Sequence, residues 1–220
     1  MTGRILALGD IHGCNTALDT LLGQIQLTAD DCLVLVGDVV DRGPGTRQVI
    51  ERLIELRDYC ELHFVRGNHE QMLLGVLDGT FTREADWLIH GGREVLDCYE
   101  GSLANMPAEH VDFLRSSIDY YETATEVFVH ASLEPGVPLT EQHEKWLRWV
   151  RYTGRELPLP TGQRVVCGHT PQATGLPARS RGWACIDTYV YGTGWLTGLD
   201  VLTDEFFQAD QQGRYRTGQL

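Results

Sequence analysis

The sequence predicts an α/β fold in which two packed mixed β-sheets are flanked by helices. Short β-branched runs alternate with helical periodicity through the first 80 residues, a pattern typical of a largely parallel sheet with right-handed crossovers. Residues 81–117 have a mainly helical pattern. Beyond residue 120, short strands separated by Gly- and Pro-rich turns indicate a second, more mixed sheet.

The first half of the chain predicts three strand–helix units. Strands are expected at three apolar runs, namely 5–8, 32–36 and 62–65. Apolar residues recur at helical spacing within 18–25 and 49–56, and a third helix is expected over 70–77. Asn15 is the expected N-cap of the first helix, because its side chain can accept a hydrogen bond from a free backbone N–H.

The second half predicts short strands that would form the second sheet: 127–129, 164–167, 183–186 and 196–202. No internal repeat or linker interrupts the chain, so one domain is expected over 1–220, with 81–117 as a helical cap over one edge of the site. Trp146 and Trp149 lie three residues apart in a helical segment and are expected to pack in the core.

The overall composition excludes several classes of function. Eighteen basic and 31 acidic residues give a net charge of −13, which argues against nonspecific binding to nucleic acids or acidic membranes. The six cysteines form no CxxC pair, which favours a reduced, cytoplasmic protein. No signal peptide or membrane-spanning run is recognisable.

Polar residues follow several of the predicted strands, at the point where each strand ends. Asp10 and His12 follow the first strand, Asp38 the second and Asn68 the third, whereas His130 and His169 follow two later strands. Because parallel strands present their carboxyl ends to a common crevice, these side chains should converge. Carboxylates combined with imidazoles suit transition metals, and these six side chains provide enough ligands for two ions.

Three further residues complete a site for phosphate-ester hydrolysis. Two metal ions about 3.5–4 Å apart can clamp the attacking and leaving oxygens and hold a hydroxide for in-line attack. Arg42 lies on a Gly-flanked turn, where its guanidinium can bind phosphate oxygens. His69 can protonate the leaving group, with Asp41 holding its ring. Glu70 is expected to be structural, in the first turn of a helix.

These ordered blocks resemble those of the calcineurin-like metallophosphoesterase superfamily. The sequences Asp41-Arg42-Gly43 and Asn68-His69-Glu70 resemble most closely the serine/threonine phosphoprotein phosphatases of bacteria and bacteriophages. The resemblance runs from Gly9 to about Asp200. It implies a four-layer αββα architecture with the site at the carboxyl ends of the strands.

The resemblance also implies roles for the site residues. Asp10 and His12 would hold the first metal and Asp38 would bridge, whereas the second metal would be held by Asn68, His130 and His169. His69 would be the general acid, with Asp41 behind it, and Arg42 would bind phosphate. The family's second phosphate-binding arginine corresponds to Arg151 rather than Arg148. Two divalent ions are implied, with Mn²⁺ first and iron or zinc as alternatives.

The leading functional hypothesis is a phosphomonoesterase acting on phosphoserine and phosphothreonine in proteins, with phosphotyrosine or a small phosphoester as further substrates. The alternative is a symmetrical diadenosine tetraphosphate hydrolase, which has the same blocks. A silent phospho-ligand-binding module would lack a metal ligand or the general acid. Tyr189 stands where the family often has glycine, so it is expected to narrow the substrate cleft. The sequence leaves the oligomeric state open.

Overall fold

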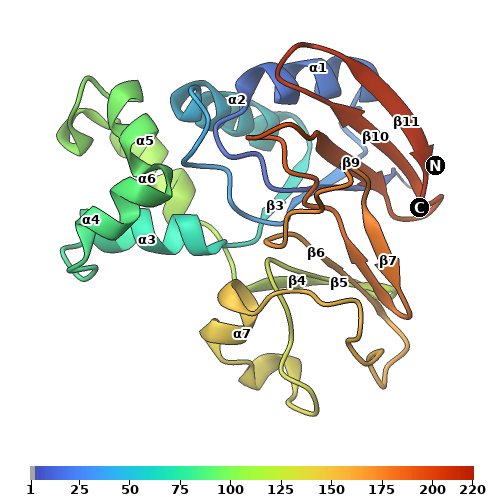
Figure 1. Ribbon diagram of the computed structural model, residues 1–220. Helices are drawn as coiled ribbons and strands as arrows, with labels where there is room; N and C mark the ends of the chain where they lie inside the picture. Colours follow the sequence, from blue (N-terminus) through green and yellow to red (C-terminus); the bar gives the residue numbers. More distant parts are fainter. Residues whose placement is uncertain (1–2) are drawn as a thin grey trace.

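The computed structural model describes residues 3–220 and contains two β-sheets packed face to face (Figure 1). In the six-stranded sheet the strands are ordered β11 (Tyr215–Gln219), β10 (Glu205–Ala209), β9 (Leu196–Asp200), β1 (Ile5–Leu8), β2 (Cys32–Leu35) and β3 (Glu61–Phe64). The three strands β1, β2 and β3 run parallel, whereas β9, β10 and β11 are joined by antiparallel pairing.

The second sheet has five strands and is also mixed. Its order is β4 (Tyr120–Glu122), β5 (Glu126–Val129), β6 (Arg164–Cys167), β8 (Trp183–Cys185) and β7 (Ala178–Ser180). The central strands β5, β6 and β8 are parallel, and both edge strands pair antiparallel to their neighbours. The parallel strands of both sheets therefore bring their carboxyl ends towards one site.

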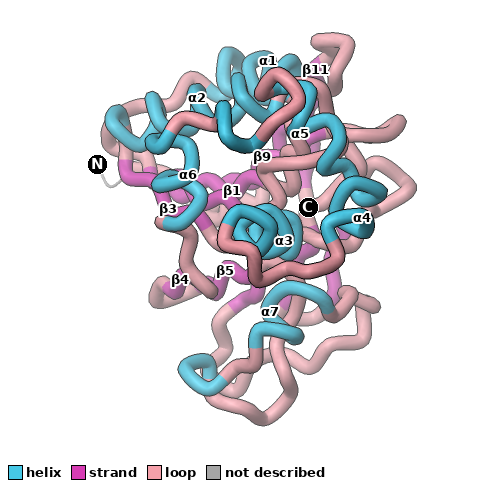
Figure 2. Tube along the Cα trace, turned by 90° about the vertical axis from the view of Figure 1, so that its left-hand side faces the viewer, coloured by secondary structure: helices cyan, strands magenta, loops and turns pink. Residues whose placement is uncertain are grey.

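Helices lie on the outside of the two sheets (Figure 2). Helices α1 (Asn15–Ile25) and α2 (Thr46–Tyr59) lie beside the six-stranded sheet, and α3 (Asn68–Leu77) follows β3. The cap contains α4 (Glu84–Trp87), the π-helical turn η1 (Leu88–Gly92), α5 (Arg93–Cys98), the 3-10 turn η2 (Leu103–Asn105) and α6 (Ala108–Arg115). The 3-10 turn η3 (Leu139–Glu141) precedes α7 (Glu144–Trp149) near the second sheet. No helix within residues 3–220 has the length and apolar character needed to cross a membrane.

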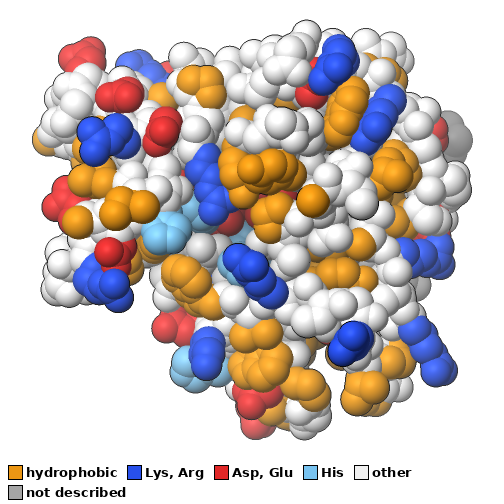
Figure 3. Space-filling view, in the orientation of Figure 1, with side chains coloured by type: hydrophobic (Ala, Val, Ile, Leu, Met, Phe, Trp, Pro, Cys, Tyr) orange, Lys and Arg blue, Asp and Glu red, His pale blue; other side chains and the backbone are white. Residues whose placement is uncertain are grey.

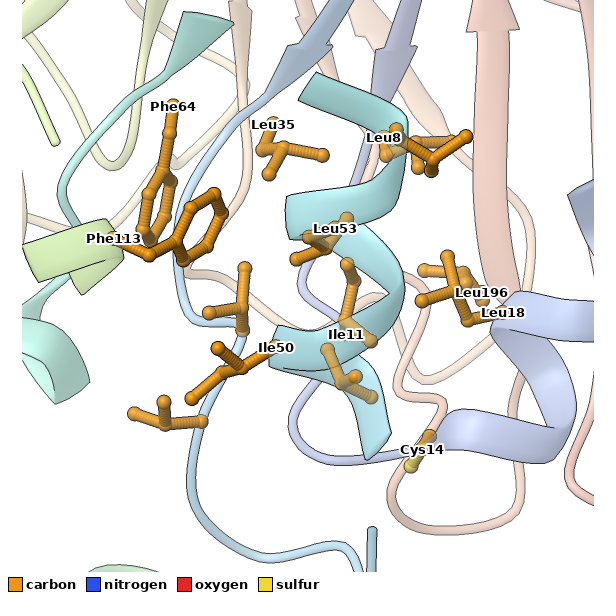
Figure 4. Close-up of a cluster of buried hydrophobic side chains, with 14 of the residues drawn as sticks. Leu8, Ile11, Cys14, Leu18, Leu35, Ile50, Leu53, Phe64, Phe113 and Leu196 are labelled. Atoms are coloured by element: carbon orange, nitrogen blue, oxygen red, sulfur yellow. The ribbon is translucent and has the colours of Figure 1, made fainter. Parts of the chain in front are cut away.

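Apolar side chains form three clusters, one on the outer face of each sheet and one between the two sheets. The largest cluster packs α1, α2 and the cap against the six-stranded sheet, and Figure 4 shows Ile50 and Leu53 of α2 within it. At its edge the rings of Phe64 and Phe113 are stacked, with centroids 5.2 Å apart. A second cluster lies between the sheets, and a third covers the outer face of the second sheet, where Leu147 of α7 packs.

The predicted fold class is confirmed, but two local predictions are wrong. The strand expected over 196–202 belongs to the first sheet, where β9 pairs antiparallel with β1 (Leu6 opposite Asp200). All five residues of β9 are buried, with Leu196 in the cluster on the helix side of the sheet and Leu199 in the cluster between the sheets, so their pattern does not reveal which sheet contains the strand. Asn15 is not an N-cap but the first helical residue, because Cys14 occupies the cap position and makes no side-chain capping bond.

Candidate functional site

The predicted site residues converge at the carboxyl ends of β1, β2, β3, β5 and β6. We call these residues the strand-end cluster: Asp10, His12, Asp38, Asn68, His69, His130 and His169. All except His169 are buried, with 5% or less of each residue exposed, and His169 is half-buried. The alternation of strands and helices therefore accounts for their proximity, although Asp10 and His169 are 159 positions apart in the sequence.

The backbone at these strand ends turns sharply. His12, Asp38 and His169 have φ values of 46°, 51° and 62°, in the left-handed region that residues other than glycine rarely adopt. A Cβ atom at Gly168 would lie 2.0 Å from an oxygen of Asp10. Strained backbone of this kind concentrates at functional sites, where the surrounding structure holds it.

The carboxylates are held by backbone N–H groups from neighbouring strand ends. The N–H of His69 donates to Oδ1 of Asp38 at 3.0 Å, and the N–H of His169 donates to Asp10 at 3.1 and 3.2 Å. Glu70 is fully buried and accepts hydrogen bonds from the N–H groups of Asp38, Val39 and Gly67. Glu70 therefore fixes the turn after β2 to the start of α3.

Each of three histidines donates one ring N–H to a carbonyl oxygen. Nδ1 of His12 donates to Val40 at 2.9 Å, and Nδ1 of His130 donates to Val36 at 2.8 Å. Nε2 of His169 donates to Trp149 at 3.2 Å. The other nitrogen of each ring therefore carries a lone pair, and this nitrogen faces the strand-end cluster.

Unprotonated donor atoms face one another in the centre of the cluster. Nε2 of His130 lies 3.0 Å from Oδ1 of Asn68 and 3.2 Å from Nδ1 of His169. Burial lowers the pKa of His130 to about 3 and that of His169 to about 4, so protons do not bridge these atoms near neutral pH. Lone pairs that converge in this way fit a bound cation.

Two groups of donor atoms share the carboxylate of Asp38. One consists of His12, Asp38 and His69, and the other of Asp38, His130 and His169, with all donor atoms in a group within 4.8 Å of one another. Nε2 of His12 lies 3.6 Å from Oδ2 of Asp38 and 3.9 Å from Oδ2 of Asp10. Asp10 is thus adjacent to the first group, which also contains His69. The residues present fit two neighbouring metal ions.

His69 belongs to a buried chain of hydrogen bonds. Its Nδ1 lies 2.5 Å from Oδ2 of Asp41, and the indole N–H of Trp87 donates to the other oxygen of Asp41 at 3.0 Å. Burial raises the pKa of Asp41, and the bond from Trp87 acts in the opposite direction. In the structure Asp41 lies behind His69, and Trp87, from the segment predicted only as a helical cap, bonds Asp41 from the other side.

Arg42 lies over the cluster from the turn after β2. Its Nη1 is 3.2 Å from Nε2 of His12, and its Nη2 is 3.1 Å from Nε2 of His69. The guanidinium carbon lies 4.1 Å from the ring centre of Tyr191. Figure 3 shows basic and histidine side chains together in the hollow between the two halves of the molecule. A cation above these histidines is suited to an anionic substrate group.

Arg148 and Arg151 have different surroundings. Arg148 is buried and forms ion pairs with Asp119 and Glu144, so its charge is already neutralised. Arg151 is exposed, in a segment tied to the cluster by the contact between Trp149 and His169. Trp149 is 42% exposed, so the prediction that it packs in the core is wrong. Its indole N–H donates instead to the side chain of Gln71 at 2.9 Å.

Asp187 is a buried carboxylate that the sequence analysis did not include in the site. One of its oxygens accepts the N–H of Tyr189 at 3.1 Å, and the other has no hydrogen-bond partner within residues 3–220. Burial raises its pKa to about 7, and its charge also raises the pKa of Asp10. Asp187 follows the buried strand β8, so the signal that identified Asp10 and Asp38 could have found it.

The comparison with protein families gives one match that spans most of the chain. The model described as calcineurin-like phosphoesterase matches residues 3–204. Among curated proteins, a symmetrical bis(5'-nucleosyl)-tetraphosphatase of Nitrosomonas europaea is 35% identical over 132 residues, 59% of this chain and 44% of that protein. One of Citrobacter koseri is 44% identical over 73 residues, 33% of this chain and 25% of that protein. The matches thus span less than half the length of these relatives.

Solved structures share the fold across the whole chain. A structure titled a putative diadenosine tetraphosphatase has a TM-score of 0.71 and 22% identity, covering 100% of this chain and 94% of its own. A protein serine/threonine phosphatase of Saccharomyces cerevisiae has a TM-score of 0.67 and 16% identity, covering 100% and 80%. A protein-tyrosine phosphatase of a Shewanella species has a TM-score of 0.65 and 19% identity, covering 99% and 80%.

Proposed function

Because the chain belongs to the calcineurin-like phosphoesterase family, we propose that it hydrolyses dinucleoside tetraphosphates symmetrically at a dinuclear metal centre. The catalytic part of this proposal rests on one observation: two groups of metal-donor atoms share Asp38 and lie beneath the guanidinium of Arg42. The expected ligands are those of the strand-end cluster other than His69: Asp10, His12, Asp38, Asn68, His130 and His169. Bound divalent cations, with Mn²⁺ as our first choice, would polarise the phosphoryl oxygens and lower the pKa of water.

The side chains around this centre have separate roles in the proposal. Arg42 and Arg151 bind the non-bridging phosphate oxygens, and Arg42 is already held by stacking on Tyr191. His69 gives a proton to the leaving oxygen, while Asp41 fixes the orientation of the ring through its contact with Nδ1. In this reaction water adds to one central phosphorus, the central P–O–P bond breaks, and diadenosine tetraphosphate yields two ADP.

The choice of substrate is supported by the relatives that are similar in sequence. Those relatives are named symmetrical tetraphosphatases and are 35–44% identical over the matched segments. The phosphatases similar in structure are below 25% identical and support the fold alone. We therefore place dinucleotide hydrolysis ahead of phosphoprotein hydrolysis, reversing the order suggested by the motifs.

A phosphoprotein phosphatase is the second candidate. Trp149, which contacts His169 through its carbonyl, is exposed, as is Arg151 two residues later, so this segment can meet a bulky substrate. In addition, the matches cover less than half of the curated relatives, so the segments of those proteins that select a dinucleotide need not all have counterparts here.

The test is a comparison of two substrates with the Mn²⁺-loaded protein. ADP release from diadenosine tetraphosphate and phosphate release from a phosphothreonine peptide are measured as kcat/KM, with Asp38→Asn as the control for contaminating activity. Preference for the dinucleotide with ADP as the sole product supports the proposal. Preference for the peptide establishes the second candidate, and ATP with AMP as products contradicts symmetrical cleavage. No hydrolysis of either substrate contradicts both candidates.

A further inference from the structure

A second group of metal-binding side chains lies at the opposite ends of β2 and β3. Cys32 begins β2 and is paired in register with Glu61, which begins β3. His63 lies two residues after Glu61, so both side chains point to the same face of the sheet. Because each strand has four residues, Cys32 and Glu61 lie a strand length of about 10 Å from the strand ends that lead into the strand-end cluster, and His63 lies one residue before the end of β3.

This group lies at the seam between the two sheets. Both β3 and β4 are edge strands, and Cys32 belongs to the cluster of side chains packed between the sheets. Tyr121 of β4 stacks on the ring of His63, with centroids 3.6 Å apart and planes 15° from parallel. The imidazole of His63 is therefore held in place by the facing sheet before any ligand binds.

The donor atoms have a spacing close to that of a metal site. The Cys32 sulfur, a Glu61 oxygen and a His63 nitrogen all lie within 4.8 Å of one another. In tetrahedral zinc sites, bond lengths of about 2.0–2.3 Å place neighbouring ligand atoms about 3.4–3.6 Å apart. Nε2 of His63 is 2.8 Å from Oε1 of Glu61, so an ion between them requires only a small outward rotation of the exposed Glu61 side chain.

The combination of donors and exposures favours a particular class of ion. A thiolate, an imidazole and a carboxylate together suit zinc and exclude magnesium and calcium, which take oxygen ligands. Cys32 is only 9% exposed, whereas the side chains of His63 and Glu61 are 25% and 63% exposed. The Cys32 sulfur therefore lies on the buried side of the site, and the fourth coordination position of the ion is open to water.

We propose that Cys32, Glu61 and His63 form a second metal site, for a zinc-class divalent cation, that joins β2 and β3 at the seam between the sheets. On binding, the Cys32 thiol loses its proton to solvent and the sulfur–metal bond forms, with no change in oxidation state. Burial raises the pKa of the Cys32 thiol to about 11, so the cation must displace this proton at neutral pH.

Cobalt titration of the metal-free full chain tests the proposal with an optical signal specific to this site. A thiolate bound to Co²⁺ gives a charge-transfer absorption in the near ultraviolet, and none of the ligands proposed for the strand-end cluster is a cysteine. The wild type is expected to show this absorption and to bind one more equivalent of Co²⁺ than Cys32→Ser. The His63→Ala variant should weaken binding at this site at least tenfold.

Cys60→Ser is the matched control, because Cys60 is the residue before β3 but packs in the opposite cluster, against the helices. It should retain the absorption and the full stoichiometry. Loss of the absorption only in Cys32→Ser supports the site. The proposal is overturned if the wild type shows no thiolate absorption, or if Cys32→Ser keeps it. Circular dichroism of each variant confirms that the fold is retained.

Discussion

At the scale of single residues, His69 has one ring nitrogen held and the other directed into the cluster. Nδ1 contacts Asp41, while Nε2 faces Arg42 and lies 3.9 Å from Oδ2 of Asp38. This geometry allows Nε2 to donate a proton to a leaving group or to ligate a metal ion. The two roles differ in what replacement of the ring does to metal content.

Under the second candidate function, we expect His69→Asn to lower kcat for a phosphothreonine peptide by about 10²–10⁴-fold, the usual contribution of a general acid. The loss should be smaller for p-nitrophenyl phosphate, because its phenolate leaves readily without a proton. Elemental analysis should find the wild-type metal content. Loss of one equivalent of metal would instead assign His69 as a ligand.

Asp187→Asn should stabilise the metal-free protein in a pH-dependent way. The pKa of Asp187 is about 7 in the native state, and the ordinary value is 3.8. Between these two pH values the carboxyl group is protonated in the native state and ionised in the unfolded state. Stability from this proton is lost as pH rises from about 4 to 7, whereas asparagine stays neutral. In urea denaturation, the free energy of unfolding of the variant should exceed that of the wild type by a larger amount at pH 8 than at pH 5. An advantage equal at both pH values would contradict this.

The convergence of many candidate site residues can be predicted from the sequence, because their positions follow from local pattern. Asp10 and Asp38 each come directly after a buried strand, and parallel strands bring such positions together. The contribution of Trp87 could not be predicted in this way. Its contact with Asp41 depends on how the cap docks, and a tryptophan in an apolar helical pattern is equally consistent with plain core packing.

At the scale of elements, the cap contributes directly to the site through α4 and η1. Trp87 ends α4 and bonds Asp41, and the carbonyl of Gly91 in η1 accepts the backbone N–H of Arg42 at 3.1 Å. A Cβ at Gly91 would lie 2.4 Å from that nitrogen. The segment therefore positions both the proposed general-acid pair, His69 and Asp41, and the proposed phosphate-binding residue Arg42.

Trp87→Phe should preserve the apolar packing and remove the hydrogen bond to Asp41. Since that bond lowers the pKa of Asp41, its loss should move the acid limb of the kcat–pH profile to higher pH. Trp183→Phe is the matched control, because Trp183 of β8 donates its indole N–H to the carbonyl of Leu157 in a loop and not to Asp41. A shift in both variants, or in neither, would contradict the positioning role.

The elements were predictable where their partners are close in sequence. The strands β1, β2 and β3 with their intervening helices match the predicted order, because each unit has its own periodicity. The hairpin of β10 and β11 was not predicted, and β9 was placed in the wrong sheet. Strand β9 finds its position by pairing with β1, about 190 residues away, and no local pattern specifies such a partner. Strand β11 has no buried residue, so the hairpin that it forms with β10 gives little apolar signal in the sequence.

At the scale of the whole molecule, cations would hold together strand ends from both sheets. Removal of metal with a chelator should therefore lower the melting temperature. An ion present at 100 times its Kd stabilises by about 2.7 kcal/mol, which corresponds to roughly 5–11 °C for a chain of this length. Thermal unfolding with and without chelator measures the change, and excess Mn²⁺ should reverse it. An unchanged melting temperature would show that no ion links the sheets.

The position of β9 also has a consequence for synthesis on the ribosome. The strand β1 carries Asp10 at its end, and one of its two neighbours in the sheet is β9, which ends at Asp200. While residues before β9 are still being translated, β1 is therefore an open edge and the metal ligands lack their final support. The centre can assemble only after residue 200 has left the exit tunnel, so the nascent chain is expected to need protection from aggregation for most of its elongation.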